Sequence, residues 1–490
     1  MLRRTKIIAS LGPSTDDPKV LDDIIQGGMD VARVNFSHGT LEQHAERVKT
    51  VRNRARAHGR QVGVMCDLQG PKIRIESFKS GRIELMEGDT FTLDTRLDPE
   101  AGTEEHVGIS YKHLPNDVNR GDTLLLNDGA IVLWVEESNT SEVRCRVVIG
   151  GELSNHKGIN RQGGGISAGA LTKKDHADIK LAAKLKADYL AISFPRNAED
   201  IHIARDLLRK AGGQGDIVAK IERAEALANI EEIIEAADVV MIARGDLGVE
   251  IGDAELPGVQ KRIIHDGRSM NRIVITATQM MQSMVENQLP TRAEVLDVAN
   301  AVLDGTDAVM LSAETSVGHY PGKVIAAVDR ICRGAERQRA AMKSSHRMDQ
   351  SFDQIDEAIA MASMYTANHL GVSAIIALTE SGSTTKWMSR ISSGIPIYAM
   401  TPRIETRRRV TLYRGVYPVS FEPGSKDHAL VNKEAIDELV RRGVVRDGDL
   451  VVITKGDLTG VTGGTNAMKI VRVGELFVPT DFKVDDKVDA

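Results

Sequence analysis

Charged and hydroxyl side chains stand at the ends of several short apolar runs, where a ligand could use them. In the run DVARVNFSHG, Arg33, Asn35 and Ser37 alternate with Val34 and Phe36, so in a strand the three polar residues share one face. Burying such a face is costly unless its groups are paired or meet a ligand. The planar guanidinium of Arg33 favours an anion site, and an ion pair with a neighbouring strand is the alternative.

A second group consists of Lys220, Glu222 and Asp246. Lys220 and Glu222 are two residues apart in DIVAKIE, and Asp246 ends the next apolar run, DVVMIARGD. If these runs are adjacent parallel strands, the two carboxylates meet at one edge. They would then form a site for Mg²⁺, which keeps several waters and takes further oxygens from a substrate. A purely structural Lys–Glu ion pair is the alternative.

Further groups lie beside these residues. Gly245 and Gly248 leave backbone N–H groups accessible to an anion, and Lys220 suits an oxygen that becomes negative during a reaction. In the run RIVITATQ, Thr276 and Thr278 share a face, so one hydroxyl could reach a ligand, although a threonine bonded within the sheet fits equally well. Ser312 and Glu314 alternate similarly in LSAE, whereas Met280 and Met281 are better explained by packing.

Near the C-terminus, the segment LTESGSTTKWMSR places hydroxyls between a predicted strand and a predicted helix. Ser381, Gly382, Ser383 and Thr384 could form a phosphate cradle from hydroxyl and backbone N–H groups. An ordinary cluster that caps a helix is the alternative. The Gly/Thr-rich loop at 455–466 could close over the same ligand.

Elements that position these residues follow from a repeated pattern of Val- and Ile-rich runs, each followed by a helical pattern. Such runs are typical of parallel strands covered on both faces, and eight of them predict a (β/α)8 barrel, which needs about 250 residues. The eight runs lie at 5–12, 30–37, 61–68, 188–194, 216–222, 238–246, 272–279 and 307–314.

The spacing of these runs leaves an insertion after the third one. Residues 71–170 contain short segments of alternating apolar and polar residues separated by turn signals, which predicts a small β domain. Because it follows the third strand, this domain would lie at the catalytic end of the barrel and act as a lid. The barrel then comprises 1–70 and 171–344. From 345 to 490 strands and helices alternate again, which predicts a separate open α/β domain with a charged tail.

Composition excludes several classes of protein. The chain of 490 residues carries 63 Lys plus Arg against 69 Asp plus Glu, a net charge of −6, and only 3% aromatic residues. It therefore offers no basic surface or stacking platform for nucleic acid. The three cysteines are widely spaced, which fits a reducing compartment. The sequence shows no signal peptide and no long apolar segment, so we expect a cytoplasmic protein without a membrane span.

Six motifs taken in order resemble the pyruvate kinase family. They are VARVNFSHG, DLQGPKIR, AKIERAEA, MIARGDLGVEI, ATQMMQSM and PTRAEVLDVANAVLDGTDAVMLSAET, and a strand-helix SGS loop follows them. The resemblance covers about Arg4 to Val473, and the family's barrel, lid and α/β domains agree with the pattern above. It implies phosphoryl transfer from phosphoenolpyruvate to ADP, giving pyruvate and ATP, in the last step of glycolysis.

The resemblance also implies roles for individual residues in the barrel. Arg33 and Lys220 hold the transferring phosphoryl group, and Lys220 stabilises its transition-state charge. Glu222 and Asp246 ligate Mg²⁺, for which Mn²⁺ can substitute. The backbone of Gly245 and Asp246, with Thr278, holds the substrate carboxylate and enolate, and Thr278 with water is the expected proton source.

Nucleotide contacts are implied where the lid joins the barrel. Arg74 and Lys157, from the two ends of the lid, resemble the family's contacts to the nucleotide phosphates. Asn35, Ser37 and His38 lie beside them in the resemblance, although His38 by itself is better explained as a supporting group.

One departure from the family concerns its monovalent cation. Potassium-requiring members have Glu where this chain has Lys72, and their cation lies among positions matching Asn35, Ser37, Asp67 and Leu68. We expect the ammonium of Lys72 to reach this region and replace the charge of K⁺, so that K⁺ binds optionally or not at all. A solvated lysine at the hinge of the lid is the alternative.

Regulation and assembly are implied by the C-terminal loop and by the family. Thr379, Ser381, Gly382, Ser383 and Thr384 match an effector-phosphate loop. Glu380 stands where members responsive to fructose-1,6-bisphosphate often have a basic residue, which predicts activation by a sugar monophosphate or AMP. The family is usually a homotetramer, and the predicted helix at 291–303 would lie at the flank of the barrel.

Two other functions are compatible with parts of the pattern. A Mg²⁺-dependent aldolase or lyase acting on 2-oxo acids also pairs Glu with Asp on a barrel, but it needs no Arg74 and Lys157 on a lid. A catalytically silent metabolite sensor would use only the C-terminal domain, and the intact set Arg33, Lys220, Glu222, Asp246 and Thr278 argues against it.

Overall fold

The computed structural model describes residues 2–338, 341–342, 351–425, 427–457 and 463–475. Contacts divide the chain into two compact units, one of residues 6–331 and the other of residues 1–5 together with 332–490. The sequence pattern, by comparison, began its third domain at 345. None of the helices in the described ranges combines the length and apolarity that crossing a membrane requires.

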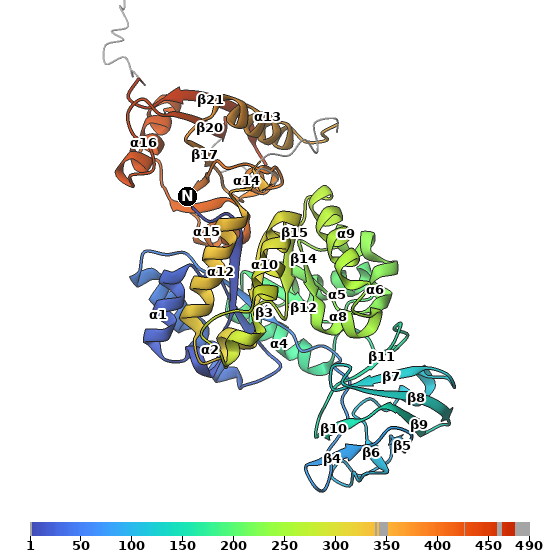
Figure 1. Ribbon diagram of the computed structural model, residues 1–490. Coiled ribbons are helices and arrows are strands. Elements are labelled where there is room, and N and C mark those ends of the chain that lie inside the picture. The colour runs from blue at the N-terminus through green and yellow to red at the C-terminus, as the bar shows by residue number, and fades with distance from the viewer. Residues whose placement is uncertain (1, 339–340, 343–350, 426, 458–462, 476–490) are drawn as a thin grey trace, which may run out of the picture. The chain divides into compact units, whose positions relative to one another are not determined.

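The first unit contains a closed barrel of eight parallel strands, as the sequence predicts (Figure 1). The strands are β1 (Lys6–Ser10), β2 (Val31–Asn35), β3 (Gly63–Asp67), β12 (Tyr189–Ile192), β13 (Asp216–Ile221), β14 (Val239–Ala243), β15 (Ile273–Ala277) and β16 (Ala308–Leu311). Each barrel strand pairs with the next barrel strand in chain order, so β3 pairs with β12. The barrel closes where Lys6 of the first strand pairs with Ala308 of the last.

Helices follow each strand and cover the outside of the barrel. The longer ones are α1 (Pro18–Gly27), α2 (Leu41–Ala57), α4 (Lys173–Lys184), α5 (Ala198–Lys210), α7 (Ile230–Ala236), α8 (Arg244–Ile251), α9 (Leu256–Ser269), α10 (Arg292–Asp304) and α12 (Pro321–Ala335). The short ones are α6 (Ala224–Ala228), α11 (Ala313–Ser316) and the 3₁₀ turns η1 (Pro13–Thr15) and η2 (Gln282–Val285).

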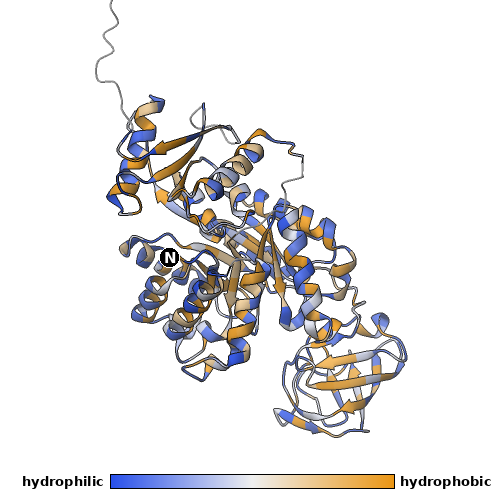
Figure 2. Cartoon of the chain, turned by 45° about the horizontal axis from the view of Figure 1, so that its top comes forward, coloured by the Kyte–Doolittle hydropathy of each residue, from blue (hydrophilic) through white to orange (hydrophobic). Residues whose placement is uncertain are grey.

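Local sequence explains where these elements form. Most barrel strands are buried along their whole length, as in β3 and β14, because helices and the barrel interior cover both faces, whereas Arg33 and Asn35 on β2 are half-buried. Figure 2 shows these strands as mainly hydrophobic and the surrounding helices as two-sided. Thr172 and Thr291 start α4 and α10 with capping boxes, in which the hydroxyl accepts an otherwise unpaired N–H.

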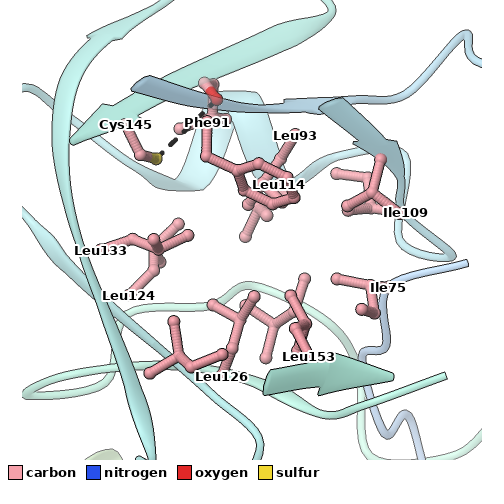
Figure 3. Close-up of a cluster of buried hydrophobic side chains, with 14 of the residues drawn as sticks. Ile75, Phe91, Leu93, Ile109, Leu114, Leu124, Leu126, Leu133, Cys145 and Leu153 are labelled. Carbon is pink, nitrogen blue, oxygen red and sulfur yellow. Dashed lines mark hydrogen bonds between the residues drawn. The ribbon is translucent and has the colours of Figure 1, made fainter. Parts of the chain in front are cut away.

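The lid follows β3 and has its own core. Its strands are β4 (Arg82–Leu85), β5 (Thr90–Asp94), β6 (His106–Gly108), β7 (Thr123–Leu126), β8 (Ile131–Ser138), β9 (Glu142–Ile149), β10 (Gly151–Ser154) and β11 (Ile159–Arg161), with the short helix α3 (Leu114–Asp117). Buried and exposed positions alternate along β4 and β9, as expected for strands with one wet face. Leucine, isoleucine and valine side chains around Phe91 and Leu114 fill the interior (Figure 3).

The second unit contains a five-stranded sheet in the order β19-β18-β17-β20-β21. Its strands are β17 (Ala374–Leu378), β18 (Ile397–Thr401), β19 (Val416–Ser420), β20 (Leu450–Gly456) and β21 (Thr465–Arg472), and its helices are α13 (Ile355–Leu370), α14 (Ser383–Ser389), α15 (Ile404–Arg409), the turn η4 (Val410–Leu412) and α16 (His428–Arg441). The first four strands are parallel, and β21 is antiparallel to β20. The charged tail and residues 458–462 of the Gly/Thr-rich loop lie outside the described residues.

Candidate active site at the carboxyl end of the barrel

Five of the eight barrel strands bring the polar residues named above to one end of the barrel. Arg33 lies on β2, Asp67 ends β3, Lys220 lies on β13, and Asp246 and Thr278 follow β14 and β15. The carboxyl ends of all strands in a parallel barrel face the same way, so residues far apart in sequence meet there.

Asp67 is the centre of this cluster. Its Oδ2 accepts a hydrogen bond of 2.6 Å from Nε of Arg33, and its Oδ1 lies 3.3 Å from Nζ of Lys220. Lys220 Nζ also lies 2.9 Å from Oε1 of Glu222. The Asp67 side chain has no exposed surface, so one buried carboxylate fixes both cations that the sequence assigns to anion binding.

These contacts determine how the buried groups titrate. Burial alone would lower the pKa of Lys220, but the carboxylates of Asp67 and Glu222 raise it above its ordinary value. Burial would likewise raise the pKa of Asp67, yet Lys220 and Arg33 hold it below its ordinary value. Lys220 and Asp67 are therefore charged at neutral pH, and the cluster presents fixed charges to a ligand.

Two serines that sequence reasoning did not single out orient the cations. Ser193, just after β12, accepts a hydrogen bond of 2.6 Å from Lys220 Nζ and donates one of 2.7 Å to the carbonyl of Leu68. Ser10, at the end of β1, accepts one of 2.8 Å from Arg33 Nη1. Their position at the end of a barrel strand was the only sequence signal that could have identified them.

Glu222 and Asp246 form an acidic pair beside Lys220. Burial raises the pKa of Glu222, Lys220 opposes the shift, and the nearby charge of Asp246 adds to it. Glu222 Oε2 accepts the N–H of Phe194 at 2.9 Å. Within the described ranges no three His, Cys, Asp or Glu side chains gather as a fuller ligand set. A cation would relieve the repulsion between the two carboxylates. Mg²⁺ fits such a site, because it commonly binds one or two carboxylates and fills its other coordination positions with water and substrate oxygens.

Lys72 contacts Asp246, one member of this acidic pair. Its Nζ lies 3.3 Å from Oδ1 of Asp246, whereas the sequence analysis expected it among Asn35, Ser37, Asp67 and Leu68. The structure thus gives Lys72 a carboxylate partner at the metal candidate. The two carboxylate oxygens of Asp67 already interact with Arg33 and Lys220. The ammonium of Lys72 therefore finds a less occupied carboxylate in Asp246.

Thr278 lies in a backbone turn that only tertiary contacts can hold. Its φ is +64° and that of Gln279 is +53°, values that are unfavourable for side chains with a Cβ. Thr278 Oγ1 donates to the carbonyl of Ala277 at 2.7 Å and accepts the N–H of Gly245 at 2.8 Å. The buried guanidinium of Arg244 donates to the Thr278 carbonyl at 2.7 Å. The start of α8 and the end of β15 are thereby locked together.

The remaining threonine and glutamate candidates have structural partners. Thr276 is buried and its Oγ1 donates to Oγ1 of Thr306 at 3.0 Å, so Thr278 is the hydroxyl of this strand that reaches the site. Glu314 accepts the N–H groups of Met281 and Ser312 at 3.1 and 2.6 Å. Met280 and Met281 are fully buried, in agreement with a packing role.

The lid brings the two nucleotide candidates together. Arg74 and Gly158 form an antiparallel bridge, and the N–H of Ile75 donates to the carbonyl of Lys157 at 2.9 Å. Arg74 Nη1 donates to the carbonyl of His156 at 2.8 Å. On the barrel side, Asn35 Oδ1 accepts the N–H of Ser37 at 3.0 Å. The side chain of Ser37 is half-buried, and His38 is exposed.

A separate cavity of about 500 Å³ lies in the second unit, over the carboxyl ends of β17 and β18. Thr379, Ser381, Ser383 and Thr384 line one wall, and Lys455 and His428 are also among the lining residues. Gly382 has φ +87° and a Cβ there would approach Val410 to 2.8 Å, so the loop requires glycine. Glu380 pairs with Arg403 at the rim.

Comparisons with known proteins agree with this arrangement. Residues 2–325 match the family model for the barrel domain of pyruvate kinase, and residues 357–471 match the model for its alpha/beta domain. The chain is 54% identical over 476 residues to pyruvate kinase II of Salmonella typhimurium, covering 96% of this chain and 99% of that protein. It is 53% identical to a Haemophilus influenzae pyruvate kinase over 93% of this chain and 96% of the relative. For a Staphylococcus aureus pyruvate kinase the identity is 40% over 97% of this chain and 81% of the relative.

Proposed function

Because this chain belongs to the pyruvate kinase family, we propose that the cluster around Asp67 carries out the family's reaction. The activity itself is that of a pyruvate kinase, the transfer of a phosphoryl group from phosphoenolpyruvate to ADP to give pyruvate and ATP. The observation that carries the assignment of residues is the contact of Lys220 with both Asp67 and Glu222. A 2-oxo-acid aldolase or lyase is not favoured.

Arg33 and Lys220 bind the phosphoryl group. Both are held by Asp67 before any ligand arrives, so little reorganisation is needed when charge moves onto the transferring oxygens. The reaction breaks the bond between phosphorus and the enol oxygen and forms one to an oxygen of the ADP β-phosphate. Lys220 stabilises the charge that spreads over the phosphoryl oxygens during this step.

Glu222 and Asp246 would hold the divalent metal. Their mutual repulsion and their hard oxygen donors support Mg²⁺, with Mn²⁺ as a substitute. Such an ion supplies charge neutralisation to substrate oxygens when it is bound. Lys72 balances the charge of Asp246, with its Nζ 3.3 Å from Oδ1 of that carboxylate.

Thr278 and the start of α8 bind the carboxylate and enolate end of the substrate. The N–H of Gly245 donates to Thr278 Oγ1, and the N–H of Asp246 stands at the same helix N-terminus. An arriving carboxylate takes the place of Thr278 Oγ1 as acceptor of the Gly245 N–H. For proton delivery, the Thr278 hydroxyl turns from the Ala277 carbonyl, to which it donates here, toward the enolate carbon. It gives its proton to that carbon and regains one from water, which completes pyruvate.

Arg74 and Lys157 contact the nucleotide phosphates from the lid, and Asn35, Ser37 and His38 do so from the barrel. The support is that the antiparallel bridge of Arg74 with Gly158, and the hydrogen bond from Ile75 N–H to the Lys157 carbonyl, bring the two segments side by side. Closure of the lid would bring both cations over the phosphoryl group and exclude water from it.

The monovalent cation is replaced by Lys72. Three cations, Arg33, Lys72 and Lys220, face three carboxylates in the cluster. A potassium ion among Asn35, Ser37, Asp67 and Leu68 would add a charge beside Arg33 and Lys220. In addition, Ser193 already donates to the Leu68 carbonyl. Both facts support catalysis that does not require K⁺.

The cavity over β17 and β18 binds an activator with one phosphate. Hydroxyls of Ser381, Ser383 and Thr384 line it, and the charge of Glu380, only partly offset by Arg403, disfavours a second phosphate. A sugar monophosphate or AMP fits this chemistry. The enzyme is proposed to work as a cytoplasmic homotetramer, which the exposed Leu296 and Leu303 on α10 support.

We also propose three functional parts, with the barrel at 1–70 and 171–344, the lid at 71–170 and the regulatory domain at 345–490. The contact grouping differs from these bounds, because it places residues 1–5 and the segment from 332 onward in the second unit.

A coupled assay for pyruvate tests the whole proposal. Phosphoenolpyruvate, ADP and Mg²⁺ together are expected to give equal amounts of pyruvate and ATP, and omission of ADP is expected to abolish both. Pyruvate formed from a 2-oxo acid without ADP would instead identify a lyase. A surface variant such as Lys184→Met serves as the matched control for variants of the site lysines.

A further inference from the structure

Both chain crossings between the lid and the barrel reach helix α8. Lys72, on the first crossing, lies 3.3 Å from Asp246. Asn160, on lid strand β11 just before the second crossing, donates from Nδ2 to Oε1 of Glu250 at 3.2 Å. Asp246 and Glu250 are four residues apart on α8, so they occupy one face of the helix. This face therefore supports the lid at two points, one at each end of the helix.

The contact at Glu250 is the more enclosed of the two. Asn160 and Glu250 are 9% and 5% exposed, whereas the side chains of Lys72 and Asp246 are 28% and 20% exposed. The backbone adds a second link, because the N–H of Gly163 donates to the Glu250 carbonyl at 2.9 Å. A hydrogen bond shielded from water on both sides costs more to break than an exposed ion pair.

Glu250 also connects the lid to the strand that carries the catalytic residues. Its Oε2 accepts the N–H of Ala224 at 2.9 Å, two residues beyond Glu222. On the lid side, Asn160 lies three residues after Lys157, and the N–H of Ile159 donates to the Ile73 carbonyl next to Arg74 at 3.0 Å. A displacement of Asn160 therefore moves both nucleotide candidates together.

We propose that the hydrogen bond between Asn160 and Glu250 is the pivot of the lid and that the two residues position Arg74 and Lys157 for the nucleotide. The Lys72–Asp246 contact depends on a carboxylate that the metal also needs, so it changes during the reaction. The pivot involves no such group and persists while the lid moves. This inference rests on the proposed function, because it takes Arg74 and Lys157 as nucleotide contacts.

Two substitutions test the pivot as a matched pair. In Asn160→Asp, two carboxylates face each other and the hydrogen bond is lost. In the double variant Asn160→Asp with Glu250→Gln, the Gln amide donates to the new carboxylate and the bond is restored with its polarity reversed. Assays are made at pH 8 and at about pH 9.5, because burial raises the pKa of Glu250 to about 7 and a second carboxylate beside it raises the pKa further. Arg223 and Glu225 are the other charged groups that act on Glu250.

The position of the lid is measured without catalysis. The chain has two tryptophans, of which Trp134 lies on lid strand β8 and Trp387 lies on α14. In a Trp387→Phe background, the anisotropy decay of Trp134 reports the motion of the lid. We expect Asn160→Asp to increase the fast component and the double variant to restore it. Hydrogen exchange at residues 158–165 is expected to follow the same order.

Kinetics then test the link to the nucleotide. Asn160→Asp is expected to raise KM for ADP roughly tenfold, with KM for phosphoenolpyruvate changed less than about twofold, and the double variant is expected to reverse the rise. Unchanged lid motion in Asn160→Asp, or no recovery in the double variant, would overturn the pivot. Increased lid motion with an unchanged KM for ADP would support the pivot and count against Arg74 and Lys157 as nucleotide contacts. Thermal unfolding of each variant identifies any general loss of stability.

Discussion

The barrel cluster and the cavity of the C-terminal unit each meet a phosphate in the proposed function, but they are built from different groups. In the barrel, buried cations and carboxylates hold one another, with Asp67 between Arg33 and Lys220. In the cavity, the hydroxyls of Ser381, Ser383 and Thr384 share the lining with Lys455, and Glu380 pairs with Arg403. Chemistry on a phosphoryl group needs fixed charge, whereas recognition of a phosphate needs only well-placed donors.

This difference predicts how each region responds to substitution. Removing one charge from the barrel cluster leaves its partner buried and unpaired, so large effects are expected there. Removing one hydroxyl from the cavity leaves other donors in place. The following substitutions test this contrast, from the largest expected effect to the smallest.

Lys220→Met keeps the length of the side chain and deletes its charge. We expect kcat to fall by at least about 10³-fold, equivalent to about 4 kcal/mol of transition-state stabilisation. Steady-state assays beside Lys184→Met, an exposed lysine on α4, provide the comparison, and circular dichroism establishes that the variant folds. Retention of most of the wild-type kcat would exclude Lys220 from the transition state.

Glu222→Ala removes one of the two carboxylates proposed for the metal. We expect activity at low Mg²⁺ to fall about 100-fold and to recover in part at high Mg²⁺ or Mn²⁺, because Asp246 and substrate oxygens remain as ligands. Titration with Mn²⁺ measured by electron paramagnetic resonance gives the affinity directly. Equal Mn²⁺ affinity in Glu222→Ala and in the exposed control Glu231→Ala would contradict the metal assignment.

Lys72→Glu reverses a charge in the cluster and so tests the balance of its cations and carboxylates. The unmodified enzyme is expected to keep most of its activity in sodium or tetramethylammonium salts at matched ionic strength. The variant is expected to gain at least about fivefold when K⁺ is added, because K⁺ then supplies the missing positive charge. Lys79→Glu, also on the lid, is the control. A wild-type enzyme inactive without K⁺ would show that Lys72 does not replace the cation.

Ser381→Asp places a negative charge in the cavity of the C-terminal unit. Activity at saturating phosphoenolpyruvate is expected to stay near the wild-type value, while activation by a sugar monophosphate or AMP at low phosphoenolpyruvate is lost, because phosphate is repelled. Titration with these compounds and with fructose-1,6-bisphosphate gives the order of preference, and Ser373→Asp is the control. Stronger activation by the bisphosphate would refute the proposed activator class.

Prediction from sequence succeeded where a local pattern has one physical explanation. The Val- and Ile-rich runs predicted all eight barrel strands, because a strand buried on both faces is apolar along its length. The alternation of apolar and polar residues in 71–170 predicted the β domain of the lid, because a strand buried on one face alternates. Periodicity alone left the choice between Thr276 and Thr278 open, since both have the right spacing, and the family resemblance pointed to Thr278. The hydrogen bond of Thr276 with Thr306 supports that choice.

The carboxylate partner of Lys72 was not predicted. The sequence analysis expected the ammonium in the region of Asn35, Ser37, Asp67 and Leu68, and the structure shows a contact with Asp246. Ser10 and Ser193 were not identified, because a serine at a strand end has no distinctive pattern. Strand β21 was also not predicted. A short apolar segment carries no sequence signal for the direction in which a strand runs.

The sequence by itself determined the residue types available at each strand end, since the alternation of side chains and the parallel topology follow from local chemistry. It thereby determined that Arg33, Lys220, Glu222, Asp246 and Thr278 gather at one end of the barrel. The tertiary structure alone decided which of these groups pair. Three sets of contacts join residues at least 33 positions apart. They are the hydrogen bonds that hold the left-handed backbone at Thr278, the contacts of Asp67 with Arg33 and Lys220, and the hydrogen bond between Asn160 and Glu250. Interactions over such separations depend on closure of the barrel and placement of the lid, which no local pattern encodes.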